Sequence, residues 1–118
     1  DTHILLWWLA GDTSLGLERK SIITNPDNRI FVSVVTIWAI IIKKSLGKLK
    51  VPDGIKDVIL ANDFQILSVE ADHVMYLENL PPIHNDPFDR LLIAQSLVEN
   101  IIFITGDASI AKYDLTCL

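Results

Sequence analysis

The stretch from His84 to Asn100, HNDPFDRLLIAQSLVEN, constrains the fold more than any other part of the sequence. Asp86 before Pro87 is the pattern of an N-cap residue followed by proline at the first helical position. Asp89 is then the third helical residue, where the positive end of the helix dipole favours a carboxylate. The remainder is apolar around most of its circumference, which predicts a buried helix. Its two acidic residues either cap the helix or hold a metal ion.

Helix and strand patterns alternate along the 118 residues, a length that suits one domain spanning residues 1–118. Apolar strands are predicted at 30–33, 64–69 and 101–105. Helices are predicted at 2–9, 14–24, 34–46, 53–62, 70–80 and after 86, with Asp53 as a cap and Leu15, Leu17, Ile22 and Ile23 facing inward. The run IIFIT at 101–105 has no polar alternation, which is typical of a parallel sheet covered on both faces. The predicted fold class is therefore α/β with a parallel sheet.

Net charge, the length of the apolar runs and the cysteine count argue against several classes of function. Ten basic and fifteen acidic residues give a net charge of −5, which argues against general coating of nucleic acid. The apolar runs are shorter than the roughly 18 residues of a membrane span, so no membrane association is predicted. The single cysteine, Cys117, cannot form an internal disulfide, which favours a cytoplasmic location. The sequence opens at Asp1 without methionine, and we expect some native N-terminal residues to be missing from it.

Three aspartates occupy related places in the predicted topology. Asp107 follows the strand IIFIT, Asp89 opens the helix that leads into that strand, and Asp1 would end a strand lying upstream. Ligands of open α/β sheets bind beyond the carboxyl ends of the strands. Mg²⁺ prefers oxygen ligands, and a bound ion activates water and neutralises a phosphate. The pattern therefore predicts a shared metal site.

Each of these residues also has a structural interpretation, which stays open. Asp89 would favour a helix N-terminus, Asp107 would serve a turn or cap, and Asp1 would be a solvated terminus. Asp86 is better explained as an N-cap than as a ligand. The three histidines lack metal-ligand spacing and are assigned structural or surface roles: His3, His73 and His84.

Basic residues gather in one stretch, which contains Lys43, Lys44, Lys48 and Lys50. A cluster of this kind is usually a solvated helix end that complements the helix dipole. It is also a candidate surface for a phosphate backbone or for an acidic segment of a partner. Arg90, beside the aspartate of the predicted metal site, is a candidate for either contact.

Three segments, in this order, resemble PIN-domain ribonucleases of the VapC toxin type: DTHILLWWLAGD, FVSVVTIWAIIIKKSLGKL, and LPPIHNDPFDRLLIAQSL followed by FITGD. The resemblance covers essentially the whole chain. It implies a three-layer α/β/α fold, a homodimer, and a cognate antitoxin whose tail fills the active-site groove. It also implies a Mg²⁺- or Mn²⁺-dependent endoribonuclease, in which Asp1, Asp89 and Asp107 are the catalytic and metal-binding aspartates that match the family pattern.

One position departs from that family pattern. The helix after the strand IFVS usually carries a glutamate in a pattern like IWEI, whereas here Trp38 is followed by Ala39. Losing one of four carboxylates should weaken metal binding and relieve repulsion among the others. Two hypotheses stay open: a ribonuclease toxin of impaired activity, or a binding module that still dimerises and binds its antitoxin. A phosphotransfer receiver domain fits poorly, because no acidic pair ends the first strand region.

Overall fold

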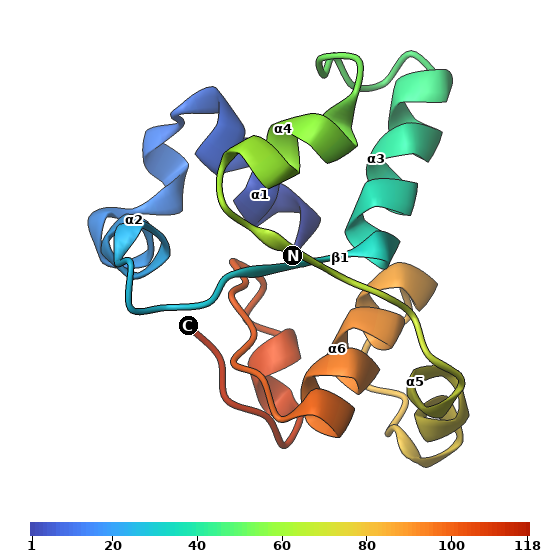
Figure 1. Cartoon of the computed structure of the whole chain (residues 1–118). Helices are drawn as coiled ribbons and strands as arrows, with labels where there is room; N and C mark the ends of the chain where they lie inside the picture. The colour runs from blue at the N-terminus through green and yellow to red at the C-terminus, as the bar shows by residue number, and fades with distance from the viewer.

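The computed structural model describes all residues from 1 to 118. Its elements, labelled in Figure 1 where space allows, are α1 (Thr2–Ala10), η1 (Thr13–Leu15), α2 (Leu17–Thr24), β1 (Phe31–Ser33), α3 (Val34–Ser45), α4 (Ile55–Ala61), β2 (Gln65–Leu67), α5 (Ala71–Tyr76), η2 (Leu77–Asn79), α6 (Pro87–Glu99) and η3 (Ile110–Lys112). Helices dominate, and short strands lie among them.

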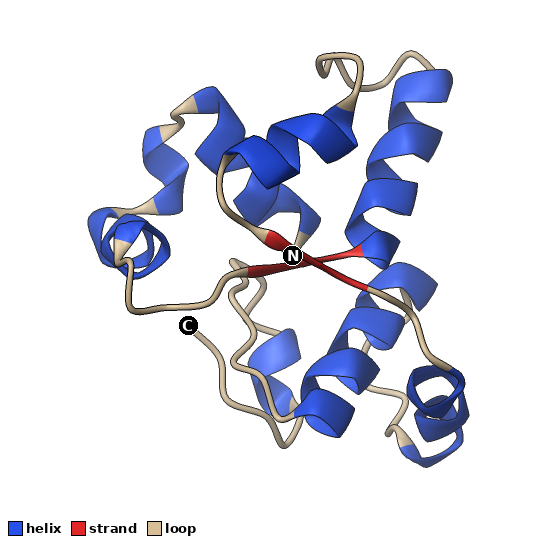
Figure 2. Cartoon of the chain, viewed as in Figure 1, coloured by secondary structure: helices blue, strands red, loops and turns tan.

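The two named strands pair in parallel, with Phe31 opposite Gln65 and Ser33 opposite Leu67. Figure 2 shows this pair in the middle of the molecule, with α1 and α4 on one side and α6 on the other. A parallel pair requires a crossover between its strands, and α3 and α4 supply it. The α/β prediction with a parallel sheet is confirmed.

The predicted strand at 101–105 is wrong as a regular strand. The segment forms one parallel bridge, between Phe103 and Cys117, and no ladder. Its pairing with the C-terminal residues is limited to one edge, where Phe103 and Thr105 exchange backbone hydrogen bonds with residues 116–118. The opposite edge has no neighbouring strand, so the extended segment lacks the second ladder that an inner strand of a sheet would have.

Two helix predictions need correction. The helix expected at 14–24 is divided at Gly16, whose φ of 85° is left-handed, and Leu17 is 87% exposed rather than inward-facing. Asp53 does not cap the next helix, because Gly54, with φ of 70°, occupies the N-cap position instead. The Asp53 carboxylate forms an exposed ion pair with Lys44.

Apolar side chains form two cores, one on each side of β1. The first is built mainly by α1, α2, α3 and α4, and contains Ile40 and Ile59, which are completely buried. The second surrounds Ile93 of α6 and includes Val35 and Phe103. No helix in the structure combines the length and the apolarity needed to cross a membrane. The two cores hold α3 against the first turns of α6 and so position the site described next.

Candidate metal centre

The N-terminus of α6 forms as the sequence predicts. The Asp86 carboxylate accepts hydrogen bonds from the backbone N–H groups of Phe88, at 2.8 Å, and Asp89, at 3.0 Å. Pro87 occupies the first helical position. Because Asp86 Oδ1 is engaged in capping, the prediction that this residue is an N-cap is confirmed.

The cap supports a first prediction. Asp86→Ala removes the acceptor for two otherwise unpaired N–H groups and should lower the free energy of unfolding by about 1 kcal/mol. Asp86→Asn, which retains a side-chain oxygen, is the matched control and should cost only a few tenths of a kcal/mol. Urea denaturation of both variants measures the difference. Equal losses would mean that the charge of Asp86, rather than its hydrogen bonds, stabilises the helix.

Asp89 and Asp107 converge on a third residue that sequence reasoning did not place in the site. The His84 Nε2 atom lies 3.2 Å from Asp89 Oδ2 and 3.1 Å from Asp107 Oδ2. One potential ligand atom from each residue lies within 4.8 Å of the others. The structure therefore brings together two of the three predicted aspartates, and adds a histidine between them.

The tautomer of His84 follows from its second ring nitrogen. The Asp86 N–H donates to Nδ1 at 3.1 Å, so Nδ1 carries the lone pair and Nε2 carries the proton. The Nε2–H group then points at both carboxylates and donates to Asp107. An N–H donor of this kind reduces the repulsion between two carboxylates in the absence of a cation.

The environments of the two carboxylates push their pKa values apart. Burial raises the pKa of Asp89, the nearby Asp86 carboxylate raises it further, and His84 opposes both effects. Hydrogen bonds from Ser109 and His84 lower the pKa of Asp107. The Ser109 hydroxyl donates at 2.7 Å and its N–H donates at 2.9 Å, both to Asp107 Oδ1. These hydrogen bonds favour the ionised form of Asp107. For Asp89, burial makes the ionised form unfavourable in the folded state.

The burial of ionised Asp89 gives a prediction about the pH dependence of stability. An acid whose pKa is raised on folding destabilises the folded state when ionised, and the penalty disappears as the pH falls through the raised pKa. Without metal at pH 7, Asp89→Asn should therefore be more stable than the unaltered chain, and the difference should shrink as the pH approaches 4. Asp107→Asn is the control of opposite sign, because the folded state favours ionised Asp107. Thermal unfolding in EDTA across this pH range tests both.

Asp1 lies beside this pair rather than inside the cluster. Its Oδ1 accepts from the Ile4 N–H at 3.1 Å and caps α1, while its Oδ2 accepts from the Thr105 hydroxyl. The same hydroxyl oxygen accepts from the Asp107 N–H at 3.0 Å. Thr105 therefore links Asp1 to Asp107. Asp1 contributes no atom to the group around His84.

The chain was compared with known protein families. The family model of the PIN domain matches residues 1–115, nearly the whole chain. The chain belongs to the PIN-domain family. PIN domains are generally metal-dependent nucleases, so the chain comes from a family of nucleases. A search of curated proteins gives no match.

Ala39 of this PIN domain is 7% exposed on α3. Its neighbour Trp38 packs edge-on against Phe88, which precedes Asp89, with ring centroids 4.7 Å apart. Thr36, one turn earlier on the same helix, lines a cavity together with Asp1. The Trp38 contact holds this part of α3 against the start of α6.

The basic residues have different surroundings. The Arg90 guanidinium donates to the carbonyl oxygens of Leu80, Pro81 and His84, and so holds the loop before α6. Lys44 is paired with an aspartate, as described above, whereas Lys43 has no ion-pair partner in the structure. The role of these residues in RNA or antitoxin contact stays a prediction, and Arg90 has a structural role in addition.

His84 gave no recognisable signal in the sequence. It lies five residues before Asp89 across a helix boundary, which is not a spacing that places two side chains on one helix face. The turn that returns its side chain to the mouth of α6 depends on the Arg90 hydrogen bonds and on Tyr113, whose hydroxyl accepts from the His84 N–H at 2.7 Å. Only the folded loop brings the imidazole to the aspartates.

Proposed function

We propose that this PIN domain is a metal-dependent endoribonuclease, the toxin of a type II toxin–antitoxin pair, with its site at Asp1, Asp89 and Asp107. The observation that carries the proposal is the convergence of Asp89 and Asp107 within 4.8 Å at the mouth of α6. Asp1 is tied to the same place through Thr105.

The donor set suits a hard divalent cation such as Mg²⁺ or Mn²⁺. Both ions prefer carboxylate oxygens and water, and three aspartates supply the carboxylates. Placing ionised Asp107 beside partly buried Asp89 costs stability without a counter-charge, and a cation would offset that cost. When bound, the ion would activate a water molecule for attack on an RNA phosphodiester and would neutralise the phosphate.

The residues of the chain have separate tasks in this proposal. Ser109 keeps Asp107 ionised and fixes one of its oxygens, so that Oδ2 is directed to the site. Thr105 holds the Asp1 carboxylate at a constant distance from the Asp107 backbone. His84 keeps Asp89 and Asp107 together before a cation arrives. Lys43 and Lys44 would lie along the RNA or along an acidic antitoxin segment.

A second function is favoured by Ala39, which supplies no carboxylate at the position where the resemblance expects one. In this alternative the chain binds metal and RNA weakly, and its remaining role is to dimerise and to bind the antitoxin. The outward face of α3 offers apolar area for such contacts, because Trp38 is 55% exposed and Ile41 is 44% exposed.

The deciding experiment measures RNA cleavage by the purified chain in Mn²⁺, in Mg²⁺ and in EDTA. The ribonuclease proposal expects slow cleavage that EDTA abolishes and that Asp107→Asn removes. Cleavage that persists in EDTA or in Asp107→Asn contradicts it. Weak Mn²⁺ binding, followed by its paramagnetic resonance signal, together with no cleavage would support the binding-module alternative.

A further inference from the structure

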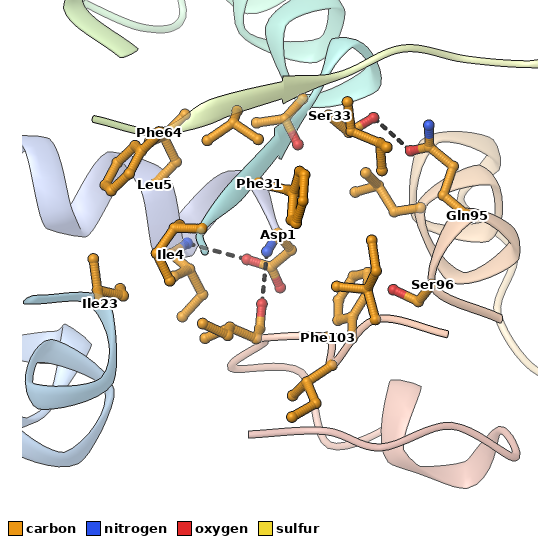
Figure 3. Close-up of a pocket in the computed structure, with 18 of the residues that line it drawn as sticks. Asp1, Ile4, Leu5, Ile23, Phe31, Ser33, Phe64, Gln95, Ser96 and Phe103 are labelled. Atoms are coloured by element: carbon orange, nitrogen blue, oxygen red, sulfur yellow. Dashed lines mark hydrogen bonds between the residues drawn. The ribbon is translucent and has the colours of Figure 1, made fainter. Parts of the chain in front are cut away.

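A tryptophan of α1 lies against the turn that carries Asp107. Gly106 precedes Asp107, and a Cβ atom added to it would come within 3.3 Å of two atoms of the Trp7 ring, Cζ3 and Cη2. The absence of a side chain at Gly106 therefore lets the indole approach the backbone of this turn. Asp1 caps the same helix, and Figure 3 shows its carboxylate at the start of α1. Helix α1 thus brings both a carboxylate and an aromatic ring to the candidate metal centre.

The two neighbouring tryptophans of α1 have different surroundings. The Trp8 N–H donates to Asn62 Oδ1 at 3.1 Å, and its ring packs against Phe64 with centroids 5.8 Å apart. Trp8 is therefore an anchor of the first core. The Trp7 N–H has no hydrogen-bond partner, and no buried side-chain polar atom in the structure lacks one, so the Trp7 N–H reaches solvent. A partly buried indole with an accessible N–H is able to contact a ligand.

His3 extends the aromatic surface of Trp7. The two residues are four positions apart on α1, which places them on one face of the helix. Their ring centroids lie 6.1 Å apart, with an angle of 47° between the ring planes. His3 is exposed, and its side chain forms no hydrogen bond or ion pair, in contrast to His73 and His84. The rings of His3 and Trp7 are called the α1 aromatic pair below.

The electrostatics of the site favour a ligand contact that does not depend on charge. The chain has a net charge of −5, and the carboxylates of the candidate metal centre repel a phosphate backbone unless a cation is bound. Stacking of bases on aromatic rings supplies affinity without a basic patch, because every base has a π face. Only unpaired bases can stack in this way, since the bases of a duplex are already stacked on one another.

We propose that the α1 aromatic pair stacks an unpaired RNA base next to the scissile phosphate, so that the substrate of the site is single-stranded RNA. Gly106 and Asp107 are consecutive, with Cα atoms about 3.8 Å apart, so a phosphate at the metal centre has its neighbouring base at Trp7. The accessible Trp7 N–H is a donor for the same nucleotide, and His3 forms the outer part of the stacking surface. The position of the phosphate rests on the proposed ribonuclease function.

Binding of strands with and without bases tests the proposal. The first probe is a fluorescein-labelled oligoadenylate of about ten nucleotides, and the second is a labelled strand of abasic ribose phosphates with the same length and charge. Fluorescence anisotropy in Mg²⁺ gives both dissociation constants, and a gel of the recovered RNA scores cleavage separately. The unaltered chain should bind the oligoadenylate about tenfold more tightly than the base-free strand.

Replacing the rings should remove this preference for bases. Trp7→Leu should bind the two strands with nearly equal affinity, whereas Trp7→Phe keeps an aromatic face and should retain most of the preference. His3→Leu should reduce the preference about threefold, and His3→Phe is its matched control. Because His3 is exposed and makes no polar contact, the His3 variants decide the test if Trp7→Leu does not fold.

Three results would overturn the proposal. The first is equal affinity of the unaltered chain for the two strands. The second is equal weakening of both strands by His3→Leu or Trp7→Leu, which would give the rings a structural role. The third is binding of the oligoadenylate annealed to its complement as tightly as the single strand.

The same measurements separate the stacking surface from the ribonuclease function. A base preference that depends on the two rings, together with an intact RNA on the gel, would support the stacking surface and contradict the ribonuclease function. Metal-dependent cleavage without any base preference would support the ribonuclease function and overturn the stacking surface.

Discussion

Ala39→Glu is expected to raise metal-dependent RNA cleavage by about 100-fold, equivalent to ~2.7 kcal/mol of transition-state stabilisation. The family resemblance places a metal-binding glutamate at this position, and Thr36, one turn earlier on the same helix, lines a cavity together with Asp1. A further oxygen ligand should tighten Mn²⁺ binding and improve the orientation of the activated water. Cleavage of a fluorescently labelled RNA in Mn²⁺, compared with EDTA, gives the ratio.

The same substitution should make the fold depend on metal. Ala39 is buried, so a glutamate there adds an uncompensated buried charge, and Ala39→Glu should melt below the unaltered chain in EDTA. Added Mn²⁺ should reverse most of that loss by binding the folded state. Ala39→Gln is the control of equal size. It should show neither the faster metal-dependent cleavage nor the stabilisation by Mn²⁺. Equal cleavage by the unaltered chain and by Ala39→Glu would show that position 39 does not belong to the site.

Asp89→Asn in the Ala39→Glu background is expected to reduce cleavage to the level seen in EDTA. The amide keeps the size of the side chain and an oxygen that can accept from His84, but it removes the negative charge that a cation requires. Stability in EDTA should not fall, since burial disfavours ionised Asp89. Loss of cleavage without loss of stability separates a role in metal binding from a role in folding.

Asp86→Asn in the same background is the neighbouring control for that experiment. It also removes one negative charge from the first turn of α6, but it keeps an oxygen that can cap the helix. Cleavage should remain within about threefold of the Ala39→Glu parent, a change of under 1 kcal/mol in the barrier. An equal collapse of activity in both variants would place Asp86 in the site alongside Asp89.

The start of α6 was predictable because its determinants are local. Asp86, Pro87 and Asp89 follow one another, and capping needs nothing from the rest of the chain. The parallel pairing of β1 with β2 was predictable for a related reason, since apolar strands alternate with helices along the sequence. Residues of the second core confirm that α6 is buried, with Ile93 completely inaccessible.

The predictions that were wrong or missing share a different cause. The segment 101–105 has the composition of an inner strand, but a strand is defined by its partners, and only one edge has them. Leu17 was expected to face inward on a continuous helix, and the left-handed turn at Gly16 changed the phase of that helix. His84 reaches the site through a loop held by distant contacts, including Tyr113. Such tertiary dependence is invisible to periodicity.

Thr105 has a consequence for the energetics of the two aspartates that it joins. Its hydroxyl group donates to Asp1 and accepts from the backbone of Asp107 at once. Residues that share one hydrogen-bonding partner do not contribute independently to stability. The losses caused by Asp1→Asn and Thr105→Val will therefore fail to add in a double-mutant cycle. The two ends of the sequence, more than a hundred residues apart, thus form one cooperative unit.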